Sequence, residues 1–274
     1  MPGINSGYSG APGTGDTTRF PSVNLWNQVD AGLLKRGMWN EVWHDFIETP
    51  FTTLPTTEGE WGLLKFFSDT GGVFTAQDLE GGVRILGSDG DNEGSYIASS
   101  NQPFKIIQNH GELVFECRVK DSTIADTKHG FIAALMDSTA LTATVPITAG
   151  GAIADVNIVG FHRLEGDGDM VDTVYKADSV TQVTVQADAI TLVADTYVKL
   201  GMVFNRGGDN ILRFYKDGLE LTTSKFIPSA AGTDFPNDVR LGWVIGALNA
   251  TATTPGNLYL DWVRIAQRNV TNAH

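Results

Sequence analysis

The stretch from Tyr197 to Leu221, YVKLGMVFNRGGDNILRFYKDGLEL, constrains the fold more than any other part of the sequence. In its first part, the side chains of Val198, Leu200, Met202 and Phe204 alternate with others and so share one face of a strand, whereas Lys199 and Asn205 lie on the opposite face. That period of two is typical of a half-buried strand. The glycine-rich turn at 206–210 leads into a second strand at 211–216, and the Asp-Gly pair at 217–218 indicates a hairpin. We therefore predict antiparallel strands here, the last of them at 219–221.

Similar short runs recur along most of the chain, separated by Gly, Pro, Asn and Asp residues. We predict further strands at 61–67, 83–86, 95–99, 104–108, 113–120, 130–136, 158–164, 175–177, 181–186, 190–193, 239–248 and 258–266. A chain of 274 residues is long enough to bury one large β domain. The spacing, without a βαβ rhythm, indicates an all-β sandwich or jelly roll.

The closing run LYLDWVRI at 258–265 has the form apolar-x-Asp-aromatic-Val-Arg. Together with the strand, the Gly/Asp/Asn turn and the aromatic-x-Asp-Gly of the first stretch, it resembles concanavalin/laminin-G-type and laminarinase-like jelly rolls. The resemblance covers about a fifth of the chain. It implies a concanavalin-like antiparallel β-sandwich, which we expect at 56–268.

The N-terminal part differs in composition from this sandwich. Residues 1–21 contain five Gly and three Pro, which favours a flexible or extended arm. The apolar side chains of this arm, Ile4, Tyr8 and Phe20, are suited to binding in a groove of a neighbouring protein. The alternative is a disordered terminus that binds no partner. Residues 22–55 are predicted to hold a short helix at 23–35 behind Ser22, followed by a Trp-rich docking segment.

Three tryptophans, Trp26, Trp39 and Trp43, concentrate amphipathic surface in this region. We interpret them either as interface anchors or as a cap on one end of the sandwich. Residues 138–155, which are low in charge and rich in Ala and Thr, are predicted to form a long surface loop that contacts a partner. Residues 269–274 are expected to be a C-terminal tail.

The net charge of −13 and the pI of about 4.7 argue against nucleic acid or an anionic membrane as partner, since both require positive potential. No apolar run approaches the ~20 residues of a membrane span. The N-terminus has neither a basic n-region nor an apolar h-region, so we expect no secretory signal. The single cysteine, Cys117, excludes an internal disulfide and is predicted to be an inert core thiol.

Two acidic, glycine-rich clusters could offer oxygen ligands to Ca²⁺. The first places Asp89, Asp91 and Glu93 at alternate positions, and the second contains Asp167 and Asp169, with Asp172 close by. Neither has the order of an EF-hand loop. Because acidic Gly-rich turns are also common without a metal, solvated turns are the alternative to calcium sites.

The first cluster is similar to the acid-x-Asp-x-acid strand of laminarinase-like glycoside hydrolases. Asp89 stands where that family has Glu, glycines interrupt the run, and the flanking tryptophans are missing. We therefore expect a turn and no catalytic set. The five histidines lack zinc spacing, and nucleophile-elbow, Walker and dinucleotide motifs are absent from the sequence. We predict that the protein is not an enzyme and has no cofactor other than Ca²⁺.

Over its whole length, the sequence also resembles tailed-phage virion proteins that carry a concanavalin-like domain. The resemblance lies in the Gly/Pro arm, RFPSVNLW, SDTGG, SDGDNEG, DSTIADTKHGF and VGFHRLEGDGD. It implies a capsid decoration (cement) protein, made in the host cytoplasm and placed on the capsid exterior. The implied partners are the major capsid protein and copies of the chain itself. The alternatives are a lectin-like module that binds surface carbohydrate and a laminarinase-like hydrolase.

Overall fold

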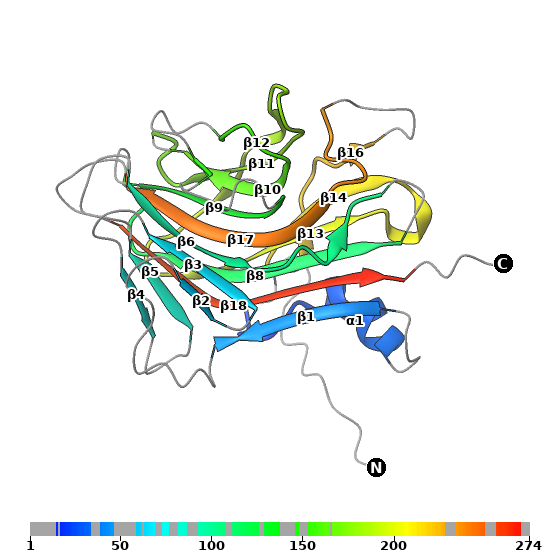
Figure 1. Ribbon diagram of the computed structural model, residues 1–274, viewed down its shortest axis with the longest axis horizontal. Helices are drawn as coiled ribbons and strands as arrows, with labels where there is room; N and C mark the ends of the chain where they lie inside the picture. Colours follow the sequence, from blue (N-terminus) through cyan, green and yellow to red (C-terminus); the bar gives the residue numbers. More distant parts are fainter. Residues whose placement is uncertain are drawn as a thin grey trace, which may run out of the picture.

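The computed structural model describes residues 15, 17–33, 39–46, 59–61, 63–68, 73–76, 82–86, 93–107, 111–125, 129–137, 146–147, 153–164, 166–227, 234–249 and 256–269. These residues form two nine-stranded antiparallel sheets that pack face to face, with one helix on the outside (Figure 1). The predicted concanavalin-like β-sandwich is therefore confirmed.

The first sheet, called sheet A, has the strand order β15-β14-β13-β8-β18-β5-β4, with β1 beside β18 and β16 beside β14. Its strands are β1 (Trp39–Asp45), β4 (Val73–Ala76), β5 (Val83–Leu86), β8 (Leu113–Asp121), β13 (Tyr197–Phe204), β14 (Ile211–Lys216), β15 (Leu219–Glu220), β16 (Lys225–Phe226) and β18 (Asn257–Arg268).

The second sheet, called sheet B, has the strand order β12-β11-β10-β9-β17-β6-β3-β2, with β7 beside β17. Its strands are β2 (Gly59–Trp61), β3 (Leu64–Ser68), β6 (Gly94–Ser99), β7 (Phe104–Lys105), β9 (His129–Met136), β10 (Ile158–Arg163), β11 (Met170–Lys176), β12 (Val183–Thr191) and β17 (Arg240–Asn249).

The main core lies between the two sheets, and the alternation read from the sequence decides which side chains enter it. On β13 the buried set Val198, Leu200, Met202 and Phe204 belongs to this core, as predicted. Asp217 and Gly218 both have positive φ, at 49° and 77°, which is the backbone of the expected hairpin turn. Cys117 is fully buried in the same core, and burial raises the pKa of its thiol well above the usual value. It is the buried core thiol that the sequence predicts.

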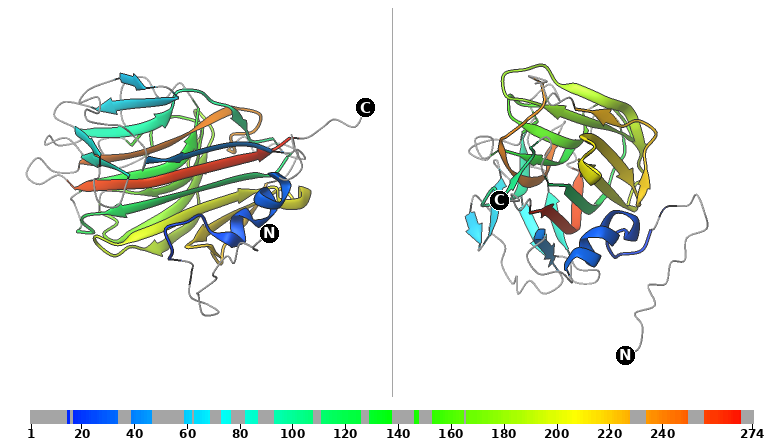
Figure 2. Two further views of the ribbon diagram at one scale, coloured as in Figure 1. Left: turned by 90° about the horizontal axis from the view of Figure 1, so that it is seen from below. Right: turned by 90° about the vertical axis from the view of Figure 1, so that its right-hand side faces the viewer.

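A third layer covers the outer face of sheet A. Helix α1 (Val23–Leu33) begins at the predicted residue, and the Ser22 carbonyl accepts hydrogen bonds from the N–H groups of Leu25 and Trp26. Its apolar side chains Leu25, Trp26 and Val29 pack on outward-facing residues of the sheet, namely Val114, Val203, Tyr215 and Ala266. Figure 2 shows the helix lying across one end of the sheet A strands. In the part of the chain described, no helix is long and apolar enough to cross a membrane.

The tryptophans predicted as docking anchors lie in this layer. Trp26 is fully buried, and its indole Nε1 donates to Glu116, so it packs inside its own chain and is not an exposed anchor. Trp39 and Trp43 lie on β1, which pairs with β18 along Trp39–Asp45. The Trp-rich segment is thus an edge strand of the sandwich, although Trp43 keeps 47% of its surface exposed. Phe20 is 72% exposed, and Tyr8 with most of the predicted arm lies outside the described residues.

The outer face of sheet B is apolar and is also covered by the chain. Ile132, Ala134 and Met136 of β9 and Val244 of β17 form a second buried cluster there. Ile147 and Ile153, joined by an isolated β-bridge, pack onto this cluster. They belong to the loop predicted at 138–155, most of which lies outside the described residues. Within the described part, this loop contacts its own sheet.

The buried carboxyl group of Glu116 holds the N-terminal segment on sheet A. It accepts hydrogen bonds from the Ser22 backbone N–H at 2.9 Å and from the Trp26 indole at 2.7 Å. Burial nevertheless raises the pKa of Glu116 above its ordinary value of 4.5, because desolvation outweighs these donors. The stability that this group contributes is therefore greatest below pH 4.5 and decreases as the pH rises through the folded pKa.

We predict that Glu116→Gln removes this pH dependence. Measured by urea denaturation between pH 4 and pH 7, the stability of the variant relative to the wild type should increase with pH, by at most about 1.4 kcal/mol per pH unit. The amide oxygen of Gln still accepts from Ser22 and Trp26, so the helix should stay in place. A stability difference that does not change with pH would contradict the assignment.

Candidate metal centre

The hairpin formed by β10 and β11 brings a histidine and an aspartate face to face. His162 and Asp172 are directly opposite in the antiparallel register. Directly opposite residues in such a pair project to the same face of the sheet with Cβ atoms about 5 Å apart. On this hairpin the shared face is the outer face of sheet B, so both side chains point away from the main core.

The loop between the two strands adds a second carboxylate. Asp167 accepts a hydrogen bond from the Leu164 N–H through its Oδ2 at 3.1 Å, and its own N–H donates to the Leu164 carbonyl. Gly166 and Gly168, with φ of 92° and 58°, permit this return of the chain at positions where a side chain would be strained. The glycine-rich turn therefore directs Asp167 back toward the strands.

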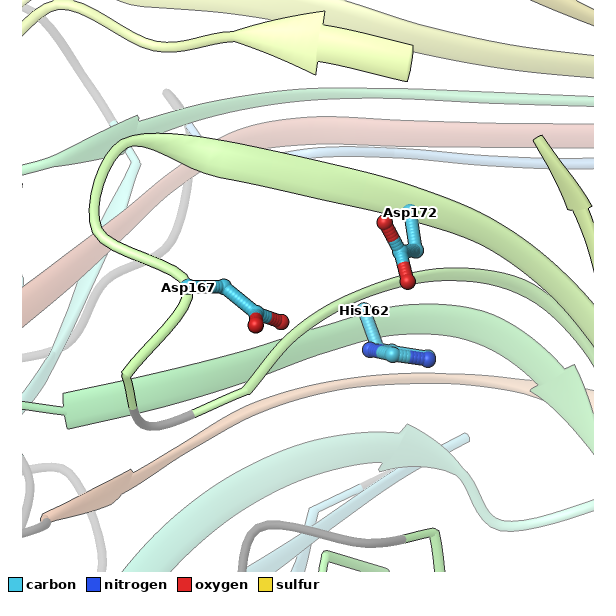
Figure 3. Close-up of side chains that lie close together, drawn as sticks. All are labelled: His162, Asp167 and Asp172. Carbon is cyan, nitrogen blue, oxygen red and sulfur yellow. The ribbon is translucent and has the colours of Figure 1, made fainter. Parts of the chain in front are cut away.

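His162, Asp167 and Asp172 converge from the strand, the loop and the opposite strand (Figure 3). One potential ligand atom from each lies within 4.8 Å of the others. A cation bound at about 2.0–2.6 Å from each ligand fits this separation. The three side chains therefore form a group that could hold a metal ion, which we call the hairpin cluster.

His162 itself supplies a second indication of a ligand. Its side chain is fully buried, and its Nδ1 has no hydrogen-bond partner among the described residues. Burial lowers the pKa of this imidazole to about 4, in spite of the neighbouring charge of Asp167. The ring is therefore neutral near pH 7, which is the form that binds metals. A buried polar atom without a partner is uncommon in a folded protein, and a bound ion is one explanation for it.

The other ring nitrogen is held by Gln182. The Gln182 side-chain amide lies 3.0 Å from His162 Nε2. Because the two ends of an amide are interchangeable by a flip, its oxygen can accept from an Nε2–H and leave the Nδ1 lone pair for a cation. Metal-binding histidines usually donate their second N–H to such a partner. Gln182 would therefore orient the ring.

The donor types restrict the metal. One imidazole nitrogen and two carboxylates suit Mn²⁺ or Zn²⁺, whereas Ca²⁺ prefers six to eight oxygen ligands. Burial also raises the pKa of Asp172, although the Asp188 N–H donates to its Oδ1 at 2.8 Å. A cation at the cluster would offset this desolvation.

The sequence identifies this centre only in part. Asp167 belongs to the hairpin cluster as a predicted ligand, but Asp169 does not, and His162 takes its place. The lack of zinc spacing among the histidines gave no indication of His162, because its partner Asp172 becomes a neighbour only through the hairpin register. In the first predicted cluster, Asp89 and Asp91 lie outside the described residues, and the Glu93 carbonyl accepts from the Asn249 N–H.

Comparison with known proteins supports the fold. No protein-family model matches the sequence, and no curated protein matches it. Among solved structures, peanut lectin is similar with 14% identity and a TM-score of 0.50, covering 85% of this chain and 100% of the lectin. The β-glucanase of Bacillus licheniformis has 13% identity and a TM-score of 0.50, covering 82% and 97%.

The carbohydrate recognition domain of Emp46p, in its potassium-bound form, is similar as well. It has 11% identity and a TM-score of 0.50, covering 74% of this chain and 88% of that domain. At these identities the likeness shows the architecture alone. The chain thus has the concanavalin-like fold, which is used by lectins and by glucanases.

We predict that the hairpin cluster binds Mn²⁺ or Zn²⁺ and that Asp167→Asn abolishes this binding. Isothermal titration calorimetry of the chelator-treated protein should give one site in the wild type and no measurable site in the variant. At a hundred times Kd, the metal should stabilise the wild type by about 2.7 kcal/mol, which is visible as a higher melting temperature.

Asp169→Asn is the matched control, since it removes the same charge from the same loop but leaves the hairpin cluster intact. Equal loss of binding in both variants would show that general negative charge, and not this geometry, attracts the ion. Unchanged binding in Asp167→Asn would refute the cluster.

Proposed function

We propose that the protein is a cation-dependent carbohydrate-binding module without enzymatic activity. The hairpin cluster is the observation that carries the proposal, because a cation there would tie the loop 164–169 to both strands of the β10–β11 hairpin. A loop held in this way presents its polar groups with little loss of entropy on binding, which is the advantage of preorganisation. The fold is shared with a lectin and with a carbohydrate recognition domain, which is compatible with this role.

The groups beside the hairpin cluster suit a neutral sugar. Gln182 and the exposed Thr184 lie on the neighbouring chain segment, with the Gln182 amide 3.4 Å from the Thr184 hydroxyl. Amides, hydroxyls and carboxylates together offer both donors and acceptors to sugar hydroxyl groups. The nearby carboxylates, including the exposed Asp188, disfavour an acidic sugar at this end of the sheet.

The absence of catalysis is part of the same proposal. Retaining and inverting glycosidases need two carboxyl groups on either side of the scissile bond. In the described part of the chain, the outward positions of the central strand β9 are Ile132, Ala134 and Met136, which are buried beneath Ile147 and Ile153. These described positions hold no carboxylate pair, which supports the absence of hydrolysis.

The capsid decoration role implied by the second resemblance is a separate proposal, together with its virion location and its capsid partners. The fold comparisons give it no support, because the similar structures named above are a lectin, a glucanase and a carbohydrate recognition domain. The burial of Trp26 removes one of its expected anchors. Co-sedimentation with capsid shells is the measurement that would favour it over a carbohydrate-binding role.

A glycan array tests the carbohydrate proposal. The wild type loaded with Mn²⁺ should bind a set of neutral glycans, and binding should fall at least tenfold after chelation or in Asp167→Asn, whereas Asp169→Asn should retain it. Binding that survives chelation would contradict the cation dependence. A folded, metal-loaded protein that binds no glycan would overturn the function.

Incubation with β-1,3- and β-1,4-glucans tests the second part. We expect no reducing ends above the level of an Asp89→Ala, Asp91→Ala, Glu93→Ala triple variant, because these residues are predicted to form a turn. Turnover that depends on the three residues would make the protein a hydrolase.

A further inference from the structure

A straight row of side chains crosses the outer face of sheet A, on the opposite side of the molecule from the hairpin cluster. In the strand registers, Thr75 pairs with Arg84, Arg84 with Tyr259, Tyr259 with Lys120, and Lys120 with Tyr197. Five adjacent strands, β4, β5, β18, β8 and β13, thus contribute one residue each. We call these five residues the cationic row.

The cationic row is on the solvent side of the sheet. Its neighbours along the strands, such as Phe74, Val83, Leu260 and Val119, point into the core between the sheets, so the row residues point outward. All five are partly exposed. Helix α1 packs on Val114, Val203 and Ala266, farther along the same strands, and so leaves this end of the face uncovered by the helix (Figure 2).

The contacts within the row hold its members in place. Lys120 Nζ lies 4.6 Å from the centre of the Tyr259 ring and 4.8 Å from that of Tyr197. The guanidinium of Arg118 lies 4.0 Å from the Tyr197 ring. Such cation–π contacts orient the rings and the ammonium group relative to one another. The row is therefore ordered before any ligand arrives.

The groups that the row presents are hydrogen-bond donors. Arg84 and Lys120 carry positive charge and only donate, while the two phenols and the Thr75 hydroxyl donate or accept. Arg84 Nη2 donates to Thr75 Oγ1 at 3.1 Å, and Arg84 Nε is buried without a partner among the described residues, so a ligand would meet the remaining N–H groups of this part-exposed guanidinium. Strands lie about 4.8 Å apart, so the row offers donors at regular intervals of about 5 Å.

Two further guanidinium groups, those of Arg118 and Arg19, lie beside the row and are paired with carboxylates. Asp261, which lies two residues from Tyr259, is fully buried and is bound by both Arg118 and Arg19. Its carboxylate is thus shielded from a ligand by two guanidinium groups. Arg19 also pairs with the exposed Asp45 at 3.4 Å, so the two guanidinium groups balance two carboxylates, and the positive charge at this end of sheet A comes from Arg84 and Lys120.

We propose that the cationic row is a second carbohydrate site, which binds a linear acidic polysaccharide of the polyuronate class. An extended polyuronate lying across the strands would place carboxylates on Arg84 and Lys120 and hydroxyls on Tyr259, Tyr197 and Thr75. A mixture of two cations and three hydroxyl groups matches a polymer with one charge per sugar. Double-stranded DNA, with one negative charge per about 1.7 Å of its axis, demands a denser line of cations, and single-stranded DNA is distinguished by the test below.

This site does not depend on the hairpin cluster, and the two bind different ligands. The test uses oligogalacturonate of defined length as the ligand, measured by calorimetry on the full chain in the presence of chelator. The wild type should bind, and Lys120→Met and Arg84→Met should each weaken binding at least tenfold, since charge-assisted hydrogen bonds are the strong ones. Met keeps much of the aliphatic stem while removing the charge.

Lys225→Met on the exposed strand β16 is the control, because it removes one positive charge far from the row in register. Binding that falls equally in this control would overturn the proposal, as would equal affinity for a neutral oligosaccharide or for single-stranded DNA. Arg84→Met serves as the independent variant if Lys120→Met lowers the melting temperature. Unchanged binding in both would also overturn it.

Asp167→Asn separates this inference from the proposed function. It should leave oligogalacturonate binding unchanged, whether or not the hairpin cluster binds a metal and a neutral glycan. Loss of oligogalacturonate binding in that variant would place the ligand at the hairpin and would refute the row.

Discussion

The buried carboxylate of Asp261 is the interaction on which the attachment of the N-terminal segment depends. Asp261 lies on β18, the strand that joins β8, β5 and β1, and it is bound by Arg118 at 2.6 Å and by Arg19 at 2.6 Å. A buried charge without partners costs several kcal/mol, so both guanidinium groups must stay in place. Arg19 therefore fixes the start of the segment against sheet A.

Other buried groups hold the following residues of the N-terminal segment on the same sheet. The Phe20 carbonyl accepts from Lys199, and Arg264 lies over the Trp26 ring and pairs with Asp30 and Glu41.

Much of the fold is predictable from the sequence, because most strands have one apolar face toward the core. The alternation on β13, the turn at Asp217-Gly218 and the start of α1 all follow from local pattern. The strands that the pattern misses have a physical reason. On β1, Trp39 and Trp43 face outward while Val42 packs on the core, so both faces are apolar and the contrast disappears. On β12, Asp188 has a φ of 50°, and the pairing with β11 is shifted at bulges. The alternation is interrupted there, so the sequence pattern predicts two strands where the structure has one.

The sites are less predictable than the strands, because they are assembled from residues that the chain brings together only by pairing. The acidic, glycine-rich turn indicates Asp167, but the histidine that completes the hairpin cluster has no metal spacing in the sequence. Its partner Asp172 is ten residues away and becomes a neighbour through the register of β10 and β11. The cationic row is still more remote from local pattern. Its five members come from five strands, and no short motif contains two of them.

The covering of both sheets by the chain itself explains where the remaining binding surfaces lie. The loop around Ile147 and Ile153 occupies the outer face of sheet B, and the helix occupies one end of sheet A. Two surfaces that the described residues of these segments do not cover are the hairpin end of sheet B, which carries carboxylates, and the end of sheet A that carries the cationic row. The net charge of −13 is therefore a poor guide to any one surface.

At physiological ionic strength, charges are screened beyond about 8 Å. A ligand at the cationic row is therefore attracted by Arg84 and Lys120 and is only weakly repelled by the carboxylates on the far side. The sequence-based argument against nucleic acid and anionic membranes concerns long-range attraction between whole molecules. It does not extend to a row of fixed cations that a ligand reaches by contact.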